Sequence, residues 1–329
     1  MAFNRIVFAG SILTDNVKII SDWPEKGMLV QVKSLRRAVG GSVCNSGIDL
    51  KKLDPSLEVR ALGKVGDDDA GDFVLATLEE SGLDTSLVMR EKGVPTSFTD
   101  VMTLESTGER TFFNMHGADS RLTPDEVDVA GLKADIFHFG YLLLLDGMDA
   151  PDEEYGTKAA RLLAKVRAAG IKTSIDIVSE KSERFRRVVL PALKYCDYAI
   201  INEVEGALAT GVDEHDLKGI CRALFDLGVK ERVVVHCPEV GVSMDKRGGY
   251  CAVGSLELPS GWIRGSVGAG DAFCAGMLYS IMKDLDPELS LRLASAAAAL
   301  NLSVSDSISA AASFEATMEL DGRFGRRSA

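Results

Sequence analysis

The sequence predicts an α/β fold with a mostly parallel sheet that helices cover on both faces. Three observations support this fold class. Short β-branched runs alternate with amphipathic helical stretches, the intervals suit right-handed crossovers between parallel strands, and 46% of the 329 residues are hydrophobic, which is enough for a sizeable core. Ligands of such sheets bind outside the carboxyl ends of the strands, so we expect functional residues there.

The expected strands and helices follow one another in pairs along the first two thirds of the chain. In order, the pairs are 5–10 with 43–53, 58–65 with 70–81, 135–139 with 152–169, 172–176 with 182–191, and 197–201 with 203–226. Hairpins at 231–253 follow, and helices at 269–283 and 287–303 complete the domain. The chain shows no linker, repeat or low-complexity segment.

Two regions break this alternation. Residues 17–34 and 97–113 have the pattern of strands without an intervening helix. In the second region the turn at 105–108 separates two strand-like runs, 96–104 and 109–113, as in a β-hairpin. Strands this short cannot bury their own apolar faces, so we expect a small sheet that needs a partner surface.

Composition and charge disfavour several classes of function. The formal net charge is −12, which disfavours nucleic acids and anionic membranes as partners, since both attract basic surfaces. The most apolar run, residues 136–145, is too short to span a bilayer. The six cysteines are scattered without metal-ligand spacing, and the first residues already have the pattern of a strand, so no secretion is expected. We therefore expect a cytoplasmic protein with reduced thiols.

The most informative segment lies near the end of the chain, at 265–273. There Gly268, Ala269 and Gly270 immediately precede Asp271 at the expected start of a helix. Small residues let a ligand approach the backbone, and the first amides of a helix have no internal partner, so this turn suits an anion such as phosphate. An acid beside that anion has a purpose if it accepts the proton of an attacking hydroxyl. That arrangement describes a kinase active site.

Glycine-rich turns before helices also occur in other settings. This segment alone is also compatible with an ordinary helix start that has an acid in its first turn. A dinucleotide-binding fingerprint reads G-x-G-x-x-G early in a chain, whereas the order here is G-x-x-G-x-G and late. The phosphate-binding motif G-x-x-x-x-G-K-[ST] does not occur in the sequence. If this segment binds phosphate, it does so by a design other than these two motifs.

The run Gly-Ala-Gly-Asp-Ala-Phe at 268–273 resembles the C-terminal signature of the ribokinase-like (PfkB) carbohydrate kinases. Further segments match that family in the same order, so the resemblance spans nearly the whole chain: 8–11 with Asp15, Gly40 to Asn45, 63–71, and Asn202 to Glu205. It implies one domain over 1–329, a ribokinase-like three-layer sandwich with a mostly parallel central sheet and a small β-lid at about 12–38 and 96–115. Lids of this family often pair, which implies a homodimer.

The resemblance also assigns roles around the phosphate. Asp271 would be the general base, and the amides of residues 268–270 would form the anion hole. Asn202 and Glu205 would organise Mg²⁺ and its water beside ATP, with Glu205 as the metal-side carboxylate. Helix capping is an equally good account of Glu205, with Asn202 as the cap, and both roles can hold together.

For the acceptor, the resemblance implies four sugar-contacting residues: Asp15, Gly40, Gly41 and Asn45. A carboxylate and an amide can bind adjacent hydroxyls, and glycine lets the sugar ring approach. Asp15 could also be an ordinary turn acid. Relatives that act on phosphosugars usually have a positively charged residue in the region where this chain has Ser42. The resemblance therefore favours an unphosphorylated sugar as the substrate. Arg110 in the hairpin is a candidate substrate contact and keeps a phosphosugar open as an alternative.

The nucleotide side departs from the family pattern. The positions implied to bind the cofactor, besides Asn202 and Glu205, are His236, Gly241 and Ser266. Gly265 stands where the signature usually has Asp, and Ile308-Ser309 replaces a Gly-Ala turn that helps to bind a monovalent cation in many relatives. Pro238 removes an amide that could contact phosphate.

These observations predict ATP- and Mg²⁺-dependent phosphorylation of a small sugar, of the ribokinase, fructokinase or 2-keto-3-deoxygluconate kinase type. Two alternatives stay open: a nucleoside kinase of the same fold, and a catalytically weak sugar-binding regulatory protein.

Overall fold

A computed structural model describes residues 3–329. Within that range nine strands form one sheet in the order β15-β14-β13-β12-β11-β8-β1-β4-β5. All neighbours are parallel except along β13-β14-β15, where the pairs are antiparallel. The strands are β1 (Arg5–Gly10), β4 (Glu58–Gly66), β5 (Asp84–Glu91), β8 (Ile136–Leu142), β11 (Lys172–Ile177), β12 (Tyr198–Asn202), β13 (Arg232–His236), β14 (Val240–Asp245) and β15 (Tyr250–Gly254).

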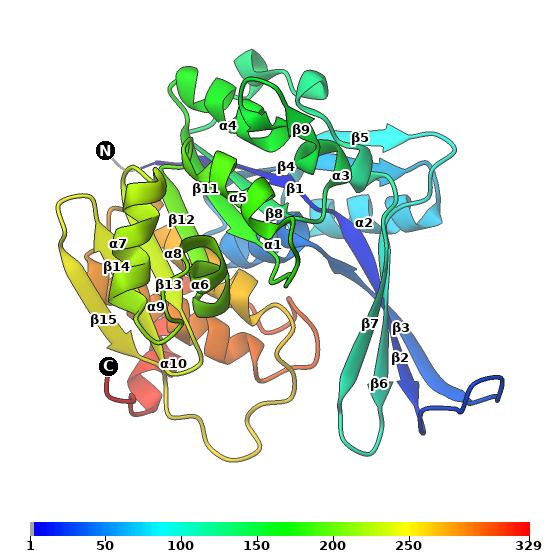
Figure 1. Cartoon of the computed structure of the whole chain (residues 1–329). Coiled ribbons are helices and arrows are strands. Elements are labelled where there is room, and N and C mark those ends of the chain that lie inside the picture. The colour runs from blue at the N-terminus through cyan, green and yellow to red at the C-terminus, as the bar shows by residue number, and fades with distance from the viewer. Residues whose placement is uncertain (1–2) are drawn as a thin grey trace.

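Helices cover both faces of this sheet (Figure 1). One face carries α3 (Asp146–Asp149), α4 (Lys158–Ala168), α5 (Phe185–Leu193), α6 (Glu203–Thr210) and α7 (Leu217–Leu227). The other carries α1 (Ser42–Leu53), α2 (Asp69–Glu80), α8 (Ala269–Met282) and α9 (Pro287–Asn301), with α10 (Phe314–Arg323) packed on α9. Side chains alternate along a strand, so in β1 Val7 joins the core of the first face while Ile6 and Phe8 join that of the second.

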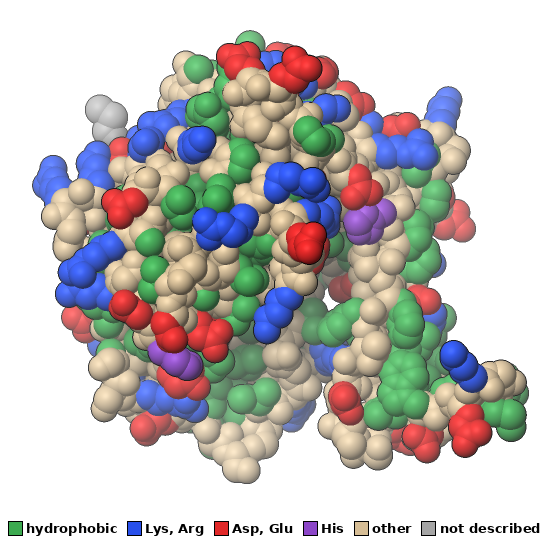
Figure 2. All heavy atoms as spheres, viewed as in Figure 1, with side chains coloured by type: hydrophobic (Ala, Val, Ile, Leu, Met, Phe, Trp, Pro, Cys, Tyr) green, Lys and Arg blue, Asp and Glu red, His purple; other side chains and the backbone are tan. Residues whose placement is uncertain are grey.

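A second sheet projects from this body (Figure 1). In the described part of the chain its four strands run in the order β3-β2-β6-β7. They are β2 (Leu13–Ile20), β3 (Val32–Gly40), β6 (Phe98–Leu104) and β7 (Arg110–Met115). Figure 2 shows hydrophobic side chains gathered on this projecting sheet, and Leu35, Phe112 and Phe113 are each more than half exposed.

Several boundaries differ from the expected ones. The helix expected at 152–169 begins only at Lys158, because the short strands β9 (Pro151–Asp152) and β10 (Gly156–Thr157) precede it. The helix expected at 203–226 is two helices, since Gly211 adopts a left-handed conformation (φ 78°) that ends α6. Strand β5 and helix α10 were not expected. Both are amphipathic, half-exposed edge elements whose pattern is weak without their neighbours.

The remaining short elements are three 3₁₀ turns, at Asp119–Arg121, Pro124–Glu126 and Val129–Gly131. Among residues 3–329, no helix has both the length and the apolar character that crossing a membrane requires.

Candidate active site

Asp271 lies in the first turn of α8, at the carboxyl edge of the main sheet. The helix follows Gly268, which adopts a left-handed conformation (φ 83°), and a Cβ at this position would lie 2.6 Å from Ser307 Cβ. At Gly270 the nearest neighbour of such a Cβ would be His236 Cε1 at 3.9 Å, so this side of the turn is open. The expected turn before a helix start is therefore present, and its Gly270 side is open to a ligand; anion binding there stays a prediction.

Three side chains donate hydrogen bonds to the Asp271 carboxylate. Tyr141 Oη is 2.6 Å from Oδ1, Ser46 Oγ is 3.2 Å from Oδ1, and Asn45 Nδ2 is 3.0 Å from Oδ2. Burial raises the pKa of Asp271, and these three hydrogen bonds oppose that rise. Their donors stabilise the ionised form, which is the form that a general base needs.

Asp271 shares a cleft of about 110 Å³ with carboxylates from two other strand ends. Asp176 lies at the end of β11, where the ladder with β8 is irregular, and Glu205 lies in the first turn of α6. The pKa of Asp176 is raised well above its usual value, first by burial and then by the charges of Asp271 and Glu205. Burial raises the pKa of Glu205 to about 7. Such an acidic cleft is suited to a divalent cation.

Asn202 and Glu205 form the capping box that the sequence suggested. Asn202 Oδ1 accepts from the Glu205 backbone amide at 2.8 Å, and Glu205 Oε2 accepts from the Asn202 amide at 3.0 Å. Ser179 Oγ donates to Glu205 Oε1 at 2.7 Å. Because both carboxylate oxygens already accept hydrogen bonds and also line the cleft, Glu205 suits a metal-bound water better than direct metal ligation.

The expected acceptor residues meet where the small sheet joins the body. A Cβ at Gly40 would lie 2.6 Å from Asp15 Oδ2, and one at Gly41 (φ 87°) would lie 2.4 Å from the Ser11 carbonyl oxygen. Burial, followed by the charge of Asp271, raises the pKa of Asp15 to about 7. Asn45 accepts from Ser307 Oγ at 2.8 Å, so it bridges the loop after α9 and the Asp271 carboxylate. Asp15, the glycine pair and Asn45 are thus brought together.

Arg110 reaches from β7 of the small sheet to the loop after α9. Its Nη2 donates to the Ser305 carbonyl oxygen at 2.9 Å, and a Cβ at Gly265 would lie 3.0 Å from the same nitrogen. Arg36 of β3 forms a second link to this loop, an ion pair with Asp306 at 3.0 Å. The glycine that replaces an acid in the expected signature therefore leaves room for a guanidinium.

The nucleotide-side positions are less closely grouped. His236 ends β13, lines the cleft with Asp271 and stacks on Phe273 with ring centroids 4.5 Å apart. Gly241 instead faces the Phe273 ring, 3.1 Å from where its Cβ would be, so packing explains a glycine there. The backbone carbonyl oxygen of Ser266 accepts from the Ala269 amide at 3.4 Å in the turn before α8. Nucleotide contacts by Gly241 and Ser266 stay predictions.

Sequence reasoning missed Asp176, Tyr141 and Ser46. Asp176 ends an expected strand, so the rule that ligands lie at carboxyl ends of parallel strands could have singled it out. Tyr141 and Ser46 carried no comparable signal, because they become site residues only by donating to Asp271 across the fold.

A larger hollow of about 490 Å³ lies at the opposite end of the strands. It is lined by Phe3, Tyr198 and Arg232, near the starts of β1, β12 and β13, and by Asp284 beyond the far end of α8. Size alone therefore does not mark the active site here. The smaller cleft has the helix N-terminus and the perturbed carboxylates.

Comparison with known proteins identifies the family. The model of the pfkB family carbohydrate kinases matches residues 4–313. The chain belongs to the pfkB family of carbohydrate kinases. It is 28% identical over 287 residues to fructokinase-1 of Zea mays, with 85% of this chain and 83% of the relative covered. It is also 28% identical to 5-dehydro-2-deoxygluconokinase of Shouchella clausii (strain KSM-K16), with 83% of each covered.

Solved structures show that the kinase has the ribokinase-like α/β fold. A ribokinase from Thermotoga maritima has a TM-score of 0.80 and 18% identity, with 97% of this chain and 99% of that chain covered. Ribokinase of Arabidopsis thaliana complexed with ribose and ATP has a TM-score of 0.79 and 21% identity, with 98% and 99% covered. The expected fold class and family are confirmed.

We expect the activity of this kinase to be nearly independent of potassium. Gly265 supplies no carboxylate, and the Arg110 guanidinium next to it repels a second cation. The measurement is initial rate against potassium chloride at saturating magnesium, with a bulky organic cation holding ionic strength constant. A severalfold, saturable activation would show that other oxygens bind the ion.

The raised pKa of Asp15 predicts a pH-dependent cost to stability. Because the folded-state pKa of about 7 exceeds the ordinary value of 3.8, the folded protein holds this proton more tightly than the unfolded chain. Stability is therefore lost as pH rises toward 7. Asp15→Asn should raise the melting temperature of the ligand-free kinase more at about pH 7.5 than at about pH 4.5. Equal shifts at both pH values, read by calorimetry, would contradict it.

Proposed function

We propose that this kinase transfers the γ-phosphoryl group of ATP to a hydroxyl of a small, unphosphorylated sugar, with Asp271 as general base. The observation that carries the proposal is the position of this carboxylate. It lies in the first turn of α8, lines the cleft with Asp176 and Glu205, and shares Asn45 with the acceptor side. One carboxylate thus stands between a phosphate-binding helix terminus and a pocket for polar hydroxyls.

The residues divide the work of phosphoryl transfer. Asp15 and Asn45 orient the acceptor sugar, and Asp271 takes the proton of the attacking hydroxyl. The amides of Gly268, Ala269 and Gly270 face the phosphate and stabilise charge that develops on its oxygens. Residues of β2, β3, β6 and β7 act as a lid that excludes water from the acceptor.

Asp176 and Glu205 fit Mg²⁺ as the metal of ATP. Magnesium prefers oxygen ligands, keeps several waters, and neutralises charge on the phosphates when bound. Asp176 has one oxygen that accepts from the Ile177 amide at 2.8 Å, which leaves the other for the metal or its water. Glu205 would hold a second water through its capped carboxylate.

A sugar acid is the second candidate acceptor. Arg110 places positive charge beside Asp15, and one relative is named 5-dehydro-2-deoxygluconokinase. Arg110→Gln should then lower turnover of an acidic sugar far more than that of a neutral one. Equal losses for both would assign Arg110 to the lid contact with Ser305.

The deciding experiment is an ATP-consumption screen over ribose, fructose, 2-keto-3-deoxygluconate, tagatose phosphates and nucleosides. Saturable turnover of a free sugar supports the proposal. A nucleoside as the best acceptor would replace it with nucleoside kinase activity. Tight sugar binding without turnover would indicate a regulatory protein.

A homodimer through the lid is part of the same proposal. Leu29, Leu35, Phe112 and Phe113 are 97%, 65%, 54% and 52% exposed on the lid strands and the turn between them. Phe112 and Phe113 are adjacent in β7 and so point to opposite faces of the lid, which therefore exposes apolar side chains on both faces. Such exposed apolar residues mark contact surfaces, and a second lid offers the same surfaces by symmetry. Light scattering should give the mass of a dimer for the wild type and the mass of a monomer for the double variant Phe112→Ser, Phe113→Ser.

A cytoplasmic location also fits the proposal, because all six cysteines are free thiols.

A further inference from the structure

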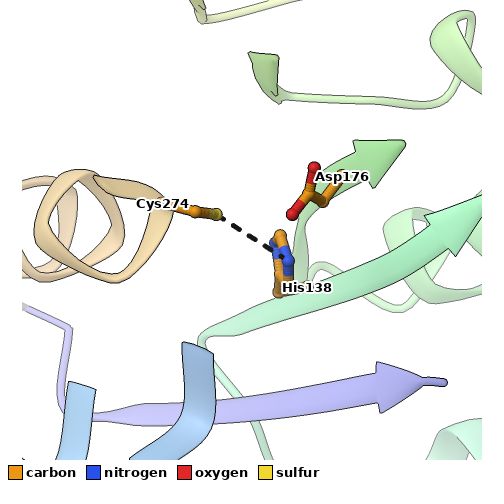
Figure 3. Close-up of side chains that lie close together, drawn as sticks. All are labelled: His138, Asp176 and Cys274. Carbon is orange, nitrogen blue, oxygen red and sulfur yellow. Dashed lines mark hydrogen bonds between the residues drawn. The ribbon is translucent and has the colours of Figure 1, made fainter. Parts of the chain in front are cut away.

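A histidine, a cysteine and an aspartate converge directly behind the cleft. His138 of β8, Cys274 of α8 and Asp176 of β11 each present one potential ligand atom, and these atoms all lie within 4.8 Å of one another (Figure 3). His138 is 0% exposed and Cys274 is 1% exposed, whereas Asp176 also lines the cleft. Phosphoryl transfer has no use for the first two side chains.

The histidine is held in an orientation that suits a metal. Its Nδ1 lies 3.1 Å from Ser174 Oγ, while Nε2 lies 3.9 Å from Cys274 Sγ and 3.5 Å from Ser42 Oγ. When Nδ1 carries the proton and donates to Ser174, the Nε2 lone pair is free on the side of Cys274 and Ser42. Burial lowers the pKa of His138 to about 3, so the imidazole is neutral.

A glycine next to the three side chains lets them lie close together, and the neighbouring carboxylates favour a cation. A Cβ at Gly140 would lie 2.5 Å from Ser42 Oγ and 3.2 Å from Asp176 Cβ, so only glycine lets these two side chains approach from either side. The charged groups that act on Asp176 are two further carboxylates, those of Asp271 and Glu205, and both raise its pKa. A divalent cation would relieve this repulsion.

We propose that His138 Nε2, Cys274 Sγ and an Asp176 oxygen bind one Zn²⁺ ion, with Ser42 Oγ or a water in the fourth position. Nitrogen, sulfur and oxygen donors in a four-coordinate set are the ligands that zinc prefers, and the thiolate disfavours magnesium. On binding, the Cys274 thiol proton leaves to solvent and a Zn–S bond replaces the S–H bond, with no change of oxidation state.

Zinc at this site would inhibit the kinase. The Asp176 carboxylate would turn from the cleft toward the bound zinc and would no longer be available to magnesium. Cys274 lies one helical turn after Asp271, so the ion would also hold the first turn of α8. Only this inhibitory consequence rests on the proposed function, since binding itself can be measured without turnover.

The binding test uses cobalt(II) as a spectroscopic substitute for zinc, added to the full-length protein without nucleotide. We expect one bound ion with tetrahedral absorption bands and a thiolate-to-cobalt charge-transfer band, which zinc abolishes. Cys274→Ser should lose the charge-transfer band, and Cys251→Ser, a change in a partly buried cysteine of β15, should keep it. A band that survives in Cys274→Ser, or no stoichiometric binding by the wild type, overturns the proposal.

A second variant separates a metal site from a structural contact. Ser174→Ala removes the partner of Nδ1 and should weaken zinc binding by about 10- to 100-fold. Cys274→Ser and Ser174→Ala should both keep the wild-type melting temperature when no metal is present, which excludes misfolding. With magnesium-ATP in excess and free zinc buffered, zinc should inhibit the wild type and Cys251→Ser but not Cys274→Ser. Inhibition that is equal in all three proteins would place zinc elsewhere.

Discussion

Replacing Asp271 by Asn is expected to lower turnover by about two to four orders of magnitude, because the substitution keeps the size of the side chain but removes the proton acceptor. The amide oxygen of Asn can still accept from Tyr141 and Ser46, whereas its NH2 group replaces the oxygen that accepts from Asn45 and loses that hydrogen bond. ATP binding should persist, since the anion-binding amides belong to the backbone of residues 268–270. Single-turnover kinetics and nucleotide titration measure the two effects separately.

Asp69→Asn is the matched control for this substitution. Asp69 also lies in the first turn of a helix, α2, but is exposed and is not among the residues that line the cleft. Its substitution should leave turnover unchanged. Wild-type turnover by Asp271→Asn would remove Asp271 from the role of base, whereas loss of ATP binding together with turnover would indicate a disturbed helix start.

Asp15→Ala should weaken sugar binding by about 1–3 kcal/mol, because a buried hydroxyl is left without its partner, while ATP binding changes little. No hydrogen bond joins Asp15 to Asp271 within the described residues, so this variant leaves the three hydrogen bonds of the base in place, although it removes a neighbouring charge. Calorimetric titration with each ligand alone measures both affinities.

Asn45→Ala provides the contrast. Asn45 links Ser307 to Asp271, so its loss should lower turnover as well as sugar affinity. Equal losses of sugar and ATP affinity in Asp15→Ala would indicate that the acceptor pocket lies elsewhere. A loss confined to the sugar would support the lid acid as an acceptor contact.

The local pattern of the chain was enough to predict most elements of the fold. The alternation of β-branched runs with amphipathic stretches predicted the parallel sheet and its covering helices, and the two regions without helices became the projecting sheet. An expected boundary was wrong where one residue interrupts a continuous pattern, as Gly211 does between α6 and α7. Strand β5 and helix α10 were not predicted, because their periodicity is weak.

In the candidate site, too, short-range patterns were visible in the sequence and long-range contacts were not. The turn at 268–270 and the acid that follows it were visible in the sequence, because helix-start amides and small residues act within a few positions of one another. Tyr141 donates to Asp271 from 130 positions away, and Arg110 contacts Ser305 from 195 positions away. Asp176 joins them only because β11 and α8 meet at the same edge of the sheet.

The sequence by itself thus determined the family, the element types and the phosphate-binding turn with its acid, all of which depend on short-range patterns. Only the tertiary structure decided which side chains hydrogen-bond to Asp271, that Arg110 occupies the space beside Gly265, and that His138, Asp176 and Cys274 converge. These contacts join distant strands and helices of the sheet, and their geometry depends on how the whole core packs.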